Sequence, residues 1–154
     1  MKQIYIGLLL LIGLMTGCNG KKNSSEKDRM QIYQIDSVDI HSGVQRMQIS
    51  RINQDITCHG NKYKLSIERA SCDSLPVVKS DMGTFADNRI TVTLTRENGK
   101  TLFSKIFTKM FFAPHLTSQF LSHSVLEGIV FDDLKTEANK EITLAASVSY
   151  PMTD

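Results

Sequence analysis

Alternation of apolar and polar residues is the clearest pattern in the chain, and it predicts β-strands. Three segments show the alternation over several residues, at 62–68, 89–96 and 142–150. Every second residue in them is apolar, as expected of a strand with one buried face and one face in water. Threonines fill the polar positions of the second segment, and β-branched residues suit a pleated sheet. The pattern therefore favours a mainly β protein.

Two further strands are predicted at 31–40 and 44–57, on weaker alternation. In the second of these segments the apolar phase slips between Ile49 and Ile52. Because side chains alternate strictly along a regular strand, such a slip indicates either a β-bulge or a wrong strand assignment.

The dipeptide Asn98-Gly99 predicts a tight turn between two strands, at 89–96 and 101–109. Asn-Gly accepts the positive φ angles of a type I′ turn, which makes a hairpin loop of two residues. Such a loop fixes which residues face each other across the hairpin. The expected pairs are Glu97 with Lys100, Leu94 with Phe103, and Ile90 with Phe107.

One helix is predicted at about 115–126. Pro114 suits a first helical turn, and Gly128 can end the helix. Four apolar residues within the segment fall on one helical stripe, namely Leu116, Phe120, Leu121 and Val125. With the strands, this predicts a single small antiparallel β sandwich or partly open barrel with one short α-helix.

The first residues of the chain have the pattern of an export signal. A short basic start at 1–3 precedes an apolar run at 4–15. A helix of a dozen residues is about 18 Å long, too short for a hydrocarbon core of about 30 Å. This length is typical of a signal peptide. The segment 14–18, Leu-Met-Thr-Gly-Cys, resembles a bacterial lipobox, in which the cysteine receives a diacylglyceryl group before cleavage. Cys18 is therefore the predicted lipid attachment site.

A polar segment follows the predicted lipid site. Residues 19–29 contain no large apolar side chain, so they cannot bury enough surface to fold by themselves. A flexible segment of this length spans about 20 Å on average. We therefore divide the chain into a lipoprotein signal peptide at 1–17, a lipidated Cys18 with a tether to residue 29, and one β-rich domain at 30–154. Such a protein would be anchored to a membrane of the bacterial envelope, with the outer membrane expected.

Charge narrows the classes of partner. The formal net charge is +2, with 41% hydrophobic and 22% charged residues. A near-neutral chain of this kind excludes a strongly basic nucleic-acid-binding protein, so no nucleic-acid partner is expected. The membrane, through Cys18, is the expected partner, together with a possible envelope protein of unknown identity.

Two cysteines lie in the predicted domain. An even pair in an oxidising envelope suggests a disulfide between Cys58 and Cys72. A strand at 62–69 would instead hold its two ends about 20 Å apart, whereas disulfide-bonded Cα atoms lie within about 7 Å. Both a disulfide and two separate thiols therefore stay open.

The histidines give no metal-binding pattern. His115 and His123 are eight residues apart, about 12 Å along a helix, so they cannot share a metal as an i, i+4 pair does. The dipeptide Cys58-His59 precedes Gly60 and resembles a turn. We expect no metal and no cofactor.

The acidic residues give no catalytic pattern either. Asp81, Asp87 and Asn88 lack the spacing of an EF-hand, and a solvated turn is the expectation for them. Asp132 and Asp133 would point to opposite faces of a strand. We expect no catalytic residues.

Five segments of the predicted domain carry a resemblance to a known family. They are 73–79 (Asp-Ser-Leu-Pro-Val-Val-Lys), 87–90 (Asp-Asn-Arg-Ile), 103–109 (Phe-Ser-Lys-Ile-Phe-Thr-Lys), 126–131 (Leu-Glu-Gly-Ile-Val-Phe) and 145–154 (Ala-Ala-Ser-Val-Ser-Tyr-Pro-Met-Thr-Asp). Over about 45–154 the chain resembles an uncharacterised domain of unknown function in lipoproteins of Bacteroidetes-type bacteria. The resemblance implies no activity. It implies that related chains continue into a further strand, so a C-terminally shortened domain with one unpaired sheet edge is expected.

These observations predict a non-enzymatic binding or interaction module of the envelope. The alternative is a periplasmic enzyme inhibitor, with 71–88 as its exposed loop, or a small envelope hydrolase. A hydrolase would require His115 or His123 beside an acid and a hydroxyl group. A truncated copy without function is a third possibility.

Overall fold

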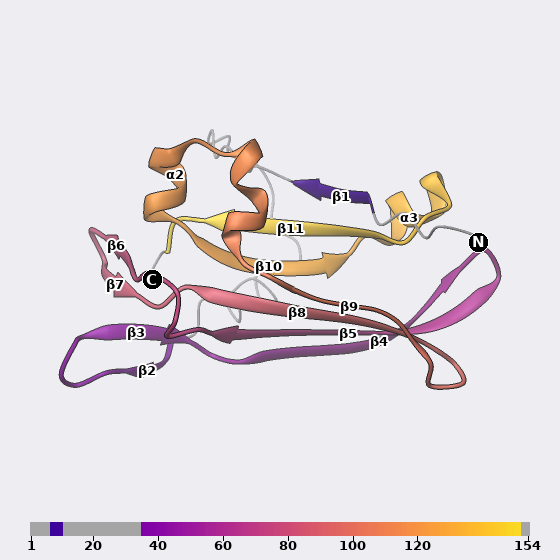
Figure 1. Ribbon diagram of the computed structural model, residues 1–154, viewed down its shortest axis with the longest axis horizontal. Coiled ribbons are helices and arrows are strands. Elements are labelled where there is room, and N and C mark those ends of the chain that lie inside the picture. Colours follow the sequence, from indigo (N-terminus) through magenta and orange to yellow (C-terminus); the bar gives the residue numbers. More distant parts are fainter. Residues whose placement is uncertain (1–6, 11–34, 152–154) are drawn as a thin grey trace, which may run out of the picture.

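The structure is a computed structural model that describes residues 7–10 and 35–151. Its strands form three sheets, drawn in Figure 1. The strands are β1 (Gly7–Leu10), β2 (Ile35–Val38), β3 (Val44–Met47), β4 (Ser50–Cys58), β5 (Asn61–Ser71), β6 (Val78–Ser80), β7 (Gly83–Phe85), β8 (Asn88–Arg96), β9 (Thr101–Phe107), β10 (Val125–Phe131) and β11 (Thr143–Ser149). The helices are the 3₁₀-helix η1 (Lys109–His115), α2 (Ser118–His123) and α3 (Asp133–Asn139).

Two of the sheets face each other. The main sheet has the order β4-β5-β8-β9 and is antiparallel throughout. The covering sheet has the order β1-β11-β10, and Figure 1 draws β10 and β11 above the main sheet. The end sheet, β2-β3-β7-β6, lies at one end of this pair. In the described residues the sheets do not close into a barrel, so the fold is a small β sandwich with short helices.

The core lies between the main and covering sheets. Its buried side chains come from alternate positions of the strands, which confirms the strands predicted at 62–68, 89–96 and 142–150. From the main sheet they include Leu65, Ile90 and Leu94, and from the covering sheet Leu126 and Leu144, each at most 2% exposed. Burying a Leu or Ile side chain stabilises a fold by about 1.5–3 kcal/mol, so this layer is the main source of stability.

The β8–β9 hairpin has the predicted register but not the predicted loop. Ile90 pairs with Phe107 and Leu94 with Phe103, as expected. The loop has three residues, because Arg96 N donates to Lys100 O (2.9 Å) and Gly99 N to Arg96 O (2.9 Å). Gly99 alone takes a positive φ, +82°, and the register shifts next to Leu94. The predicted type I′ turn, with Glu97 facing Lys100, is therefore wrong; a bulge restores the core register.

The β4–β5 hairpin instead has the two-residue loop. Its residues are His59 (φ 51°) and Gly60 (φ 72°), and Cys58 pairs with Asn61 across it. Positive φ at both positions is the signature of a type I′ turn. The interpretation of Cys58-His59 as part of a turn is confirmed.

The segment 44–57 is two strands rather than one. β3 ends at Met47 in the end sheet, and β4 begins at Ser50 in the main sheet. Met47 packs with Val78 and Phe85 in a second small core, whereas Ile56 belongs to the main core. The phase slip at Ile49 thus marks the passage of the chain from one sheet to another.

The predicted helix at 115–126 is too long. Thr117 caps α2 by accepting a hydrogen bond from Phe120 N (3.2 Å), and the helix ends at His123. Val125 and Leu126 are buried as the first residues of β10. The apolar stripe at 116–125 therefore combines the short helix with the start of a core strand.

Helix α3 was not predicted. Asp132 is its N-cap and accepts a hydrogen bond from Lys135 N (2.9 Å), while Asp133 is its first residue. The expectation that Asp132 and Asp133 lie on opposite faces of a strand is wrong. The helix gives no apolar periodicity, because it is only about two turns long and its one large apolar residue, Leu134, is 79% exposed.

Strand β1 lies inside the segment predicted as a signal peptide. It pairs in parallel with β11, from Gly7 opposite Thr143 to Leu10 opposite Ala146. In this structure β1 therefore covers the edge of β11. Among the described residues, no helix has the length and apolar character needed to cross a bilayer.

Candidate functional site

A cleft lies between the β4–β5 turn and helix α3. Its volume is about 350 Å³. The lining residues combine hydroxyl, carboxyl, imidazole, amino and thiol groups, and they are Thr57, Cys58, His59, Asp133, Thr136, Glu137 and Lys140. The strand end and the helix together thus bring polar groups from distant parts of the sequence, such as His59 and Lys140, 81 residues apart, into one concave surface.

Helix α3 is fixed against the covering sheet by a buried hydroxyl. The side chain of Thr136 is 3% exposed, and its Oγ1 accepts a hydrogen bond from Thr143 N (2.9 Å). Asp133 and Glu137 lie one helical turn apart, so both carboxyl groups border the cleft. The cleft therefore has an acidic wall on α3, and the Thr136 hydroxyl holds this helix against β11.

The two walls of the cleft meet at His59 and Lys140. The Nε2 atom of His59 donates a hydrogen bond to the carbonyl oxygen of Lys140, since a carbonyl only accepts. These are the two non-glycine residues with positive φ among the described residues, at 51° and 55°. Left-handed backbone is costly for residues with a Cβ, so the contact holds two unfavourable conformations in place.

Cys58 is a buried residue that lines the cleft. Burial, and to a lesser degree the negative charge of Glu141, raise the pKa of the Cys58 thiol. The thiolate is the nucleophilic form of cysteine, so this side chain stays protonated and unreactive near neutral pH. Chemically, the cleft can bind hydrogen-bond donors or a cation through its carboxylates, and its thiol is not activated for attack.

A second polar cluster is buried beyond the other end of β5. Asp87 is 2% exposed and pairs with Lys109 Nζ (3.1 Å). Its Oδ1 accepts from Asn88 N (2.8 Å) and Leu126 N (3.0 Å), while Lys109 Nζ also donates to Ser124 O (2.7 Å). We call Asp87, Asn88 and Lys109 the Asp87 cluster. The expectation of a solvated turn at Asp87 and Asn88 is wrong, because long-range contacts bury both.

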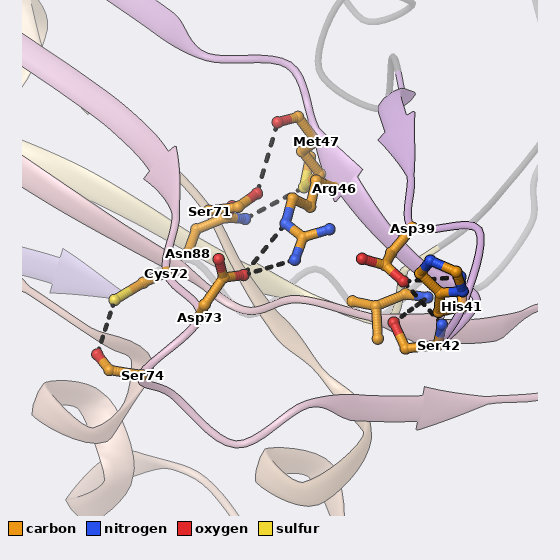
Figure 2. A network of polar contacts seen from close by, with 11 residues as sticks. Asp39, His41, Ser42, Arg46, Met47, Ser71, Cys72, Asp73, Ser74 and Asn88 are labelled. Atoms are coloured by element: carbon orange, nitrogen blue, oxygen red, sulfur yellow. Dashed lines mark hydrogen bonds and ion pairs between the residues drawn. The ribbon is translucent and has the colours of Figure 1, made fainter.

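The Asp87 cluster joins all three sheets. Asn88 Nδ2 donates to Leu126 O (3.0 Å) and contacts Met47 Sδ (3.2 Å). Figure 2 shows Asn88 beside Ser71, whose hydroxyl donates to Asn88 Oδ1 (3.3 Å). Arg69 donates further hydrogen bonds to Glu127 O (2.8 Å) and to Gln48 O (2.9 Å), which follows β3. These polar groups bind one another, so they hold sheets together rather than forming an open site.

Next to this cluster lie an exposed ion pair and a thiol (Figure 2). Arg46 donates from Nε (3.1 Å) and Nη2 (2.8 Å) to Asp73 Oδ1. Cys72 Sγ lies 3.1 Å from Ser74 Oγ. That hydroxyl, with a smaller contribution from the charge of Arg89, lowers the pKa of the Cys72 thiol. Cys72 is therefore the more readily ionised of the two described cysteines.

The possible disulfide between Cys58 and Cys72 is not formed. Both are free thiols, and they lie just beyond opposite ends of β5. A strand of eleven residues spans about 33 Å, several times the separation that a disulfide permits. Cys18, the predicted lipid site, lies outside the described residues.

The hydrogen bonds of His123 bear on the hydrolase alternative, which would place a histidine beside an acid and a hydroxyl group. His123 Nδ1 contacts Ser122 Oγ (2.8 Å) and Gln119 O (3.0 Å), neither of which is a carboxylate. Within residues 7–10 and 35–151, no group of three His, Cys, Asp or Glu side chains is arranged to hold a metal ion. The segment 71–88 contains the β6–β7 hairpin, in which Val78 and Phe85 are buried, so it is not one exposed loop.

Sequence reasoning missed both the cleft and the Asp87 cluster. One signal for the cleft was present: Asp132 as a helix cap followed by Asp133 and Glu137 at i, i+4 spacing. For the Asp87 cluster no local signal exists, because its partners are up to 41 residues away in sequence.

Comparison with known proteins gives a family but no activity. No curated protein matches the chain. A family model described as Domain of unknown function (DUF4738) matches residues 28–154. This match includes the whole sandwich from β2 to β11, with the cleft and the Asp87 cluster. The chain therefore belongs to the DUF4738 family, a family of domains of unknown function.

Proposed function

We propose that the protein is a membrane-anchored lipoprotein of the bacterial envelope, and that its β sandwich is a non-enzymatic binding module. The anchor rests on the apolar run at 4–15 and on the lipobox-like segment that ends at Cys18. The extent of the family match supports this division, because it begins at residue 28, within two residues of the predicted end of the tether. A folded module on a tether of this kind samples ligands close to the membrane surface.

The observation that carries the binding role is the chemistry of the cleft. Its acidic wall, Asp133 and Glu137, faces the imidazole of His59 across a volume that suits a small ligand or one side chain of a larger one. The raised pKa of Cys58 keeps the available thiol protonated. Carboxylates without an activated nucleophile suit recognition of an amine or of a ligand with several hydroxyl donors.

The anchor is tested by Cys18→Ala in a Gram-negative host supplied with labelled palmitate. We expect the unchanged protein to carry label and to sediment with membranes, and the variant to do neither. Cys72→Ala is the matched control, since it removes another thiol outside the main core and should keep both properties. If the Cys18→Ala protein still carries the label, the lipobox prediction is wrong.

The binding role is tested with spermidine as a cationic probe. A chain beginning at residue 18, with Cys18→Ser, is titrated by calorimetry. We expect heat of binding that is lost in the double variant Asp133→Asn/Glu137→Gln. The control Asp55→Asn/Glu97→Gln removes the same charge from exposed positions outside the cleft. Equal loss in both variants would show non-specific charge attraction and contradict a cleft site.

A further inference from the structure

The edge of the covering sheet depends on a segment that the proposed function removes. β1 (Gly7–Leu10) is the partner of β11 on the side away from β10. If residues 1–17 are cleaved as a signal peptide, β11 becomes an edge strand from Thr143 to Ala146. An edge strand presents unpaired N–H and C=O groups, which are a template for another strand.

The hydrogen bonds to β10 show which groups of β11 would be exposed. Asp132 N donates to Thr143 O (2.9 Å), and the register continues with Val130 opposite Ala145. Backbone groups alternate in direction along an antiparallel pair, so the carbonyl of Thr143 and both backbone groups of Ala145 point toward β10, while Thr143 N donates to Thr136 Oγ1. Leu144 and Ala146 therefore direct their N–H and C=O groups toward β1, and lose their partners when β1 is absent.

The orientation of this edge is fixed by core packing, and its outward side includes a small apolar area. The side chains of Leu144 (1% exposed) and Ala146 (2%) lie in the main core, so β11 cannot turn away to protect its backbone. On the outward side, Ala145 pairs with Val130, which is 50% exposed. A strand added at this edge would therefore place every second side chain beside a small apolar surface.

We propose that, after loss of residues 1–17, the edge of β11 between Thr143 and Ala146 binds an extended apolar segment of a partner protein, which adds to the covering sheet as a parallel strand in the place of β1. The occupant is inferred from β1 itself, whose Gly-Leu-Leu-Leu segment pairs there in a parallel, uninterrupted register. The proposal rests on the signal-peptide cleavage of the proposed function and names a site distinct from the cleft. Main-chain hydrogen bonds provide affinity in this mode, and alternate side chains provide selectivity.

The test uses the chain from residue 18 with Cys18→Ser, and a peptide of residues 6–12 flanked by two lysines at each end for solubility. Amide hydrogen exchange is followed by NMR. On adding peptide, we expect amide exchange at Leu144 and Ala146 to slow by up to about tenfold. This is the protection expected when each amide gains one hydrogen bond. Exchange at Ala145 should not change, because its N–H already bonds to β10.

Two controls separate strand addition from apolar adsorption. Peptides N-methylated at Leu8 and Leu10, or at Gly7 and Leu9, differ only in which edge of the added strand lacks N–H groups. We expect one of them to lose binding and the other to keep it. On the protein, Ala145→Lys should abolish binding by placing a charge on the outward side, whereas Thr91→Lys on the main sheet should not.

Several results would overturn the proposal. Equal binding of both N-methylated peptides would indicate adsorption. A dimer of the processed chain that protects the same amides would assign the edge to a second copy. Loss of folding without residues 1–17, seen by circular dichroism, would make β1 an integral strand. None of these results depends on lipidation, so failure here is distinguishable from a negative Cys18→Ala experiment.

Discussion

The polar groups near the two ends of β5 differ in their exposure to solvent. Before its first residue, Asn61, lies the β4–β5 turn, whose His59 lines the cleft together with Asp133 and Glu137 of α3. Beyond its last residue, Ser71, Asp87 is almost fully buried and bonded to Lys109, Asn88 and the backbone. Both ends contain carboxylates, and neither was identified as a site from the sequence.

The difference teaches how to separate a binding site from a structural cluster. The groups of the Asp87 cluster bind each other and the ends of strands from different sheets, so removing one leaves another buried without a partner. The cleft carboxylates border solvent and are held by their helix alone. Three predictions sharpen this contrast, beginning with the largest expected effect.

Asp87→Asn should destabilise the protein strongly. It leaves Lys109, whose side chain is only 12% exposed, without its countercharge, and breaking a buried ion pair in this way costs about 3–5 kcal/mol. Urea unfolding followed by circular dichroism measures the loss. Glu137→Gln, at the cleft end, should change stability by no more than about 0.5 kcal/mol.

A double variant tests the cause of this loss. Asp87→Asn/Lys109→Met removes both charges and should be more stable than Asp87→Asn alone. Equal stability of the single and double variants would show that the Asp87 hydrogen bonds to backbone, rather than the lost countercharge, dominate.

The two thiols should differ clearly in reactivity. Cys72, whose pKa is lowered by Ser74, should react with iodoacetamide at a lower pH than Cys58, whose pKa is raised by burial. The thiolate reacts, so the rate at each cysteine rises as the pH approaches its own pKa. Mass spectrometry of the peptides at a series of pH values measures both rates.

Ser74→Ala is the matched variant for this experiment. It removes the hydroxyl that stabilises the Cys72 thiolate, so the pH profile of Cys72 should move upward while that of Cys58 stays in place. A profile of Cys72 that does not move would assign its ionisation to other groups.

Asp73→Ala should have the smallest effect. It breaks the ion pair with Arg46, but the Asp73 side chain is 74% exposed, and pairs of this kind contribute about 0–1 kcal/mol. The loss should shrink further in high salt, since exposed charges are screened. A larger loss that is independent of salt would give the pair a structural role like that of the Asp87 cluster.

Sequence alone predicted the strands in which every second residue is buried. The alternation at Leu65, Ile90 and Leu94 has one physical cause, a buried face, and the structure confirms it. The predicted turn at Asn98 was wrong because two hairpin geometries accept Asn-Gly, and the bulge that separates them is not visible in the residues.

Elements fixed by distant contacts were not predictable in this way. Asp87 is an ordinary turn-type residue in sequence. Its burial becomes favourable through Asn88 N beside it and through two distant partners, Lys109 and the backbone of β10. The prediction of a helix at 115–126 was too long for a related reason. Val125 is buried at the start of strand β10, but its spacing from Leu121 is also that of a helical stripe.

The hydrogen bond between His59 and Lys140 also limits when the cleft can form during folding. It joins positions 81 residues apart, so the β4–β5 turn cannot gain this partner until residue 140 has left the ribosome. Closing such a long loop has an entropic cost that local hairpin contacts avoid. We therefore expect the cleft to be the last part of the domain to mature and the first to open, with α3 and the turn exchanging their amides as one cooperative unit.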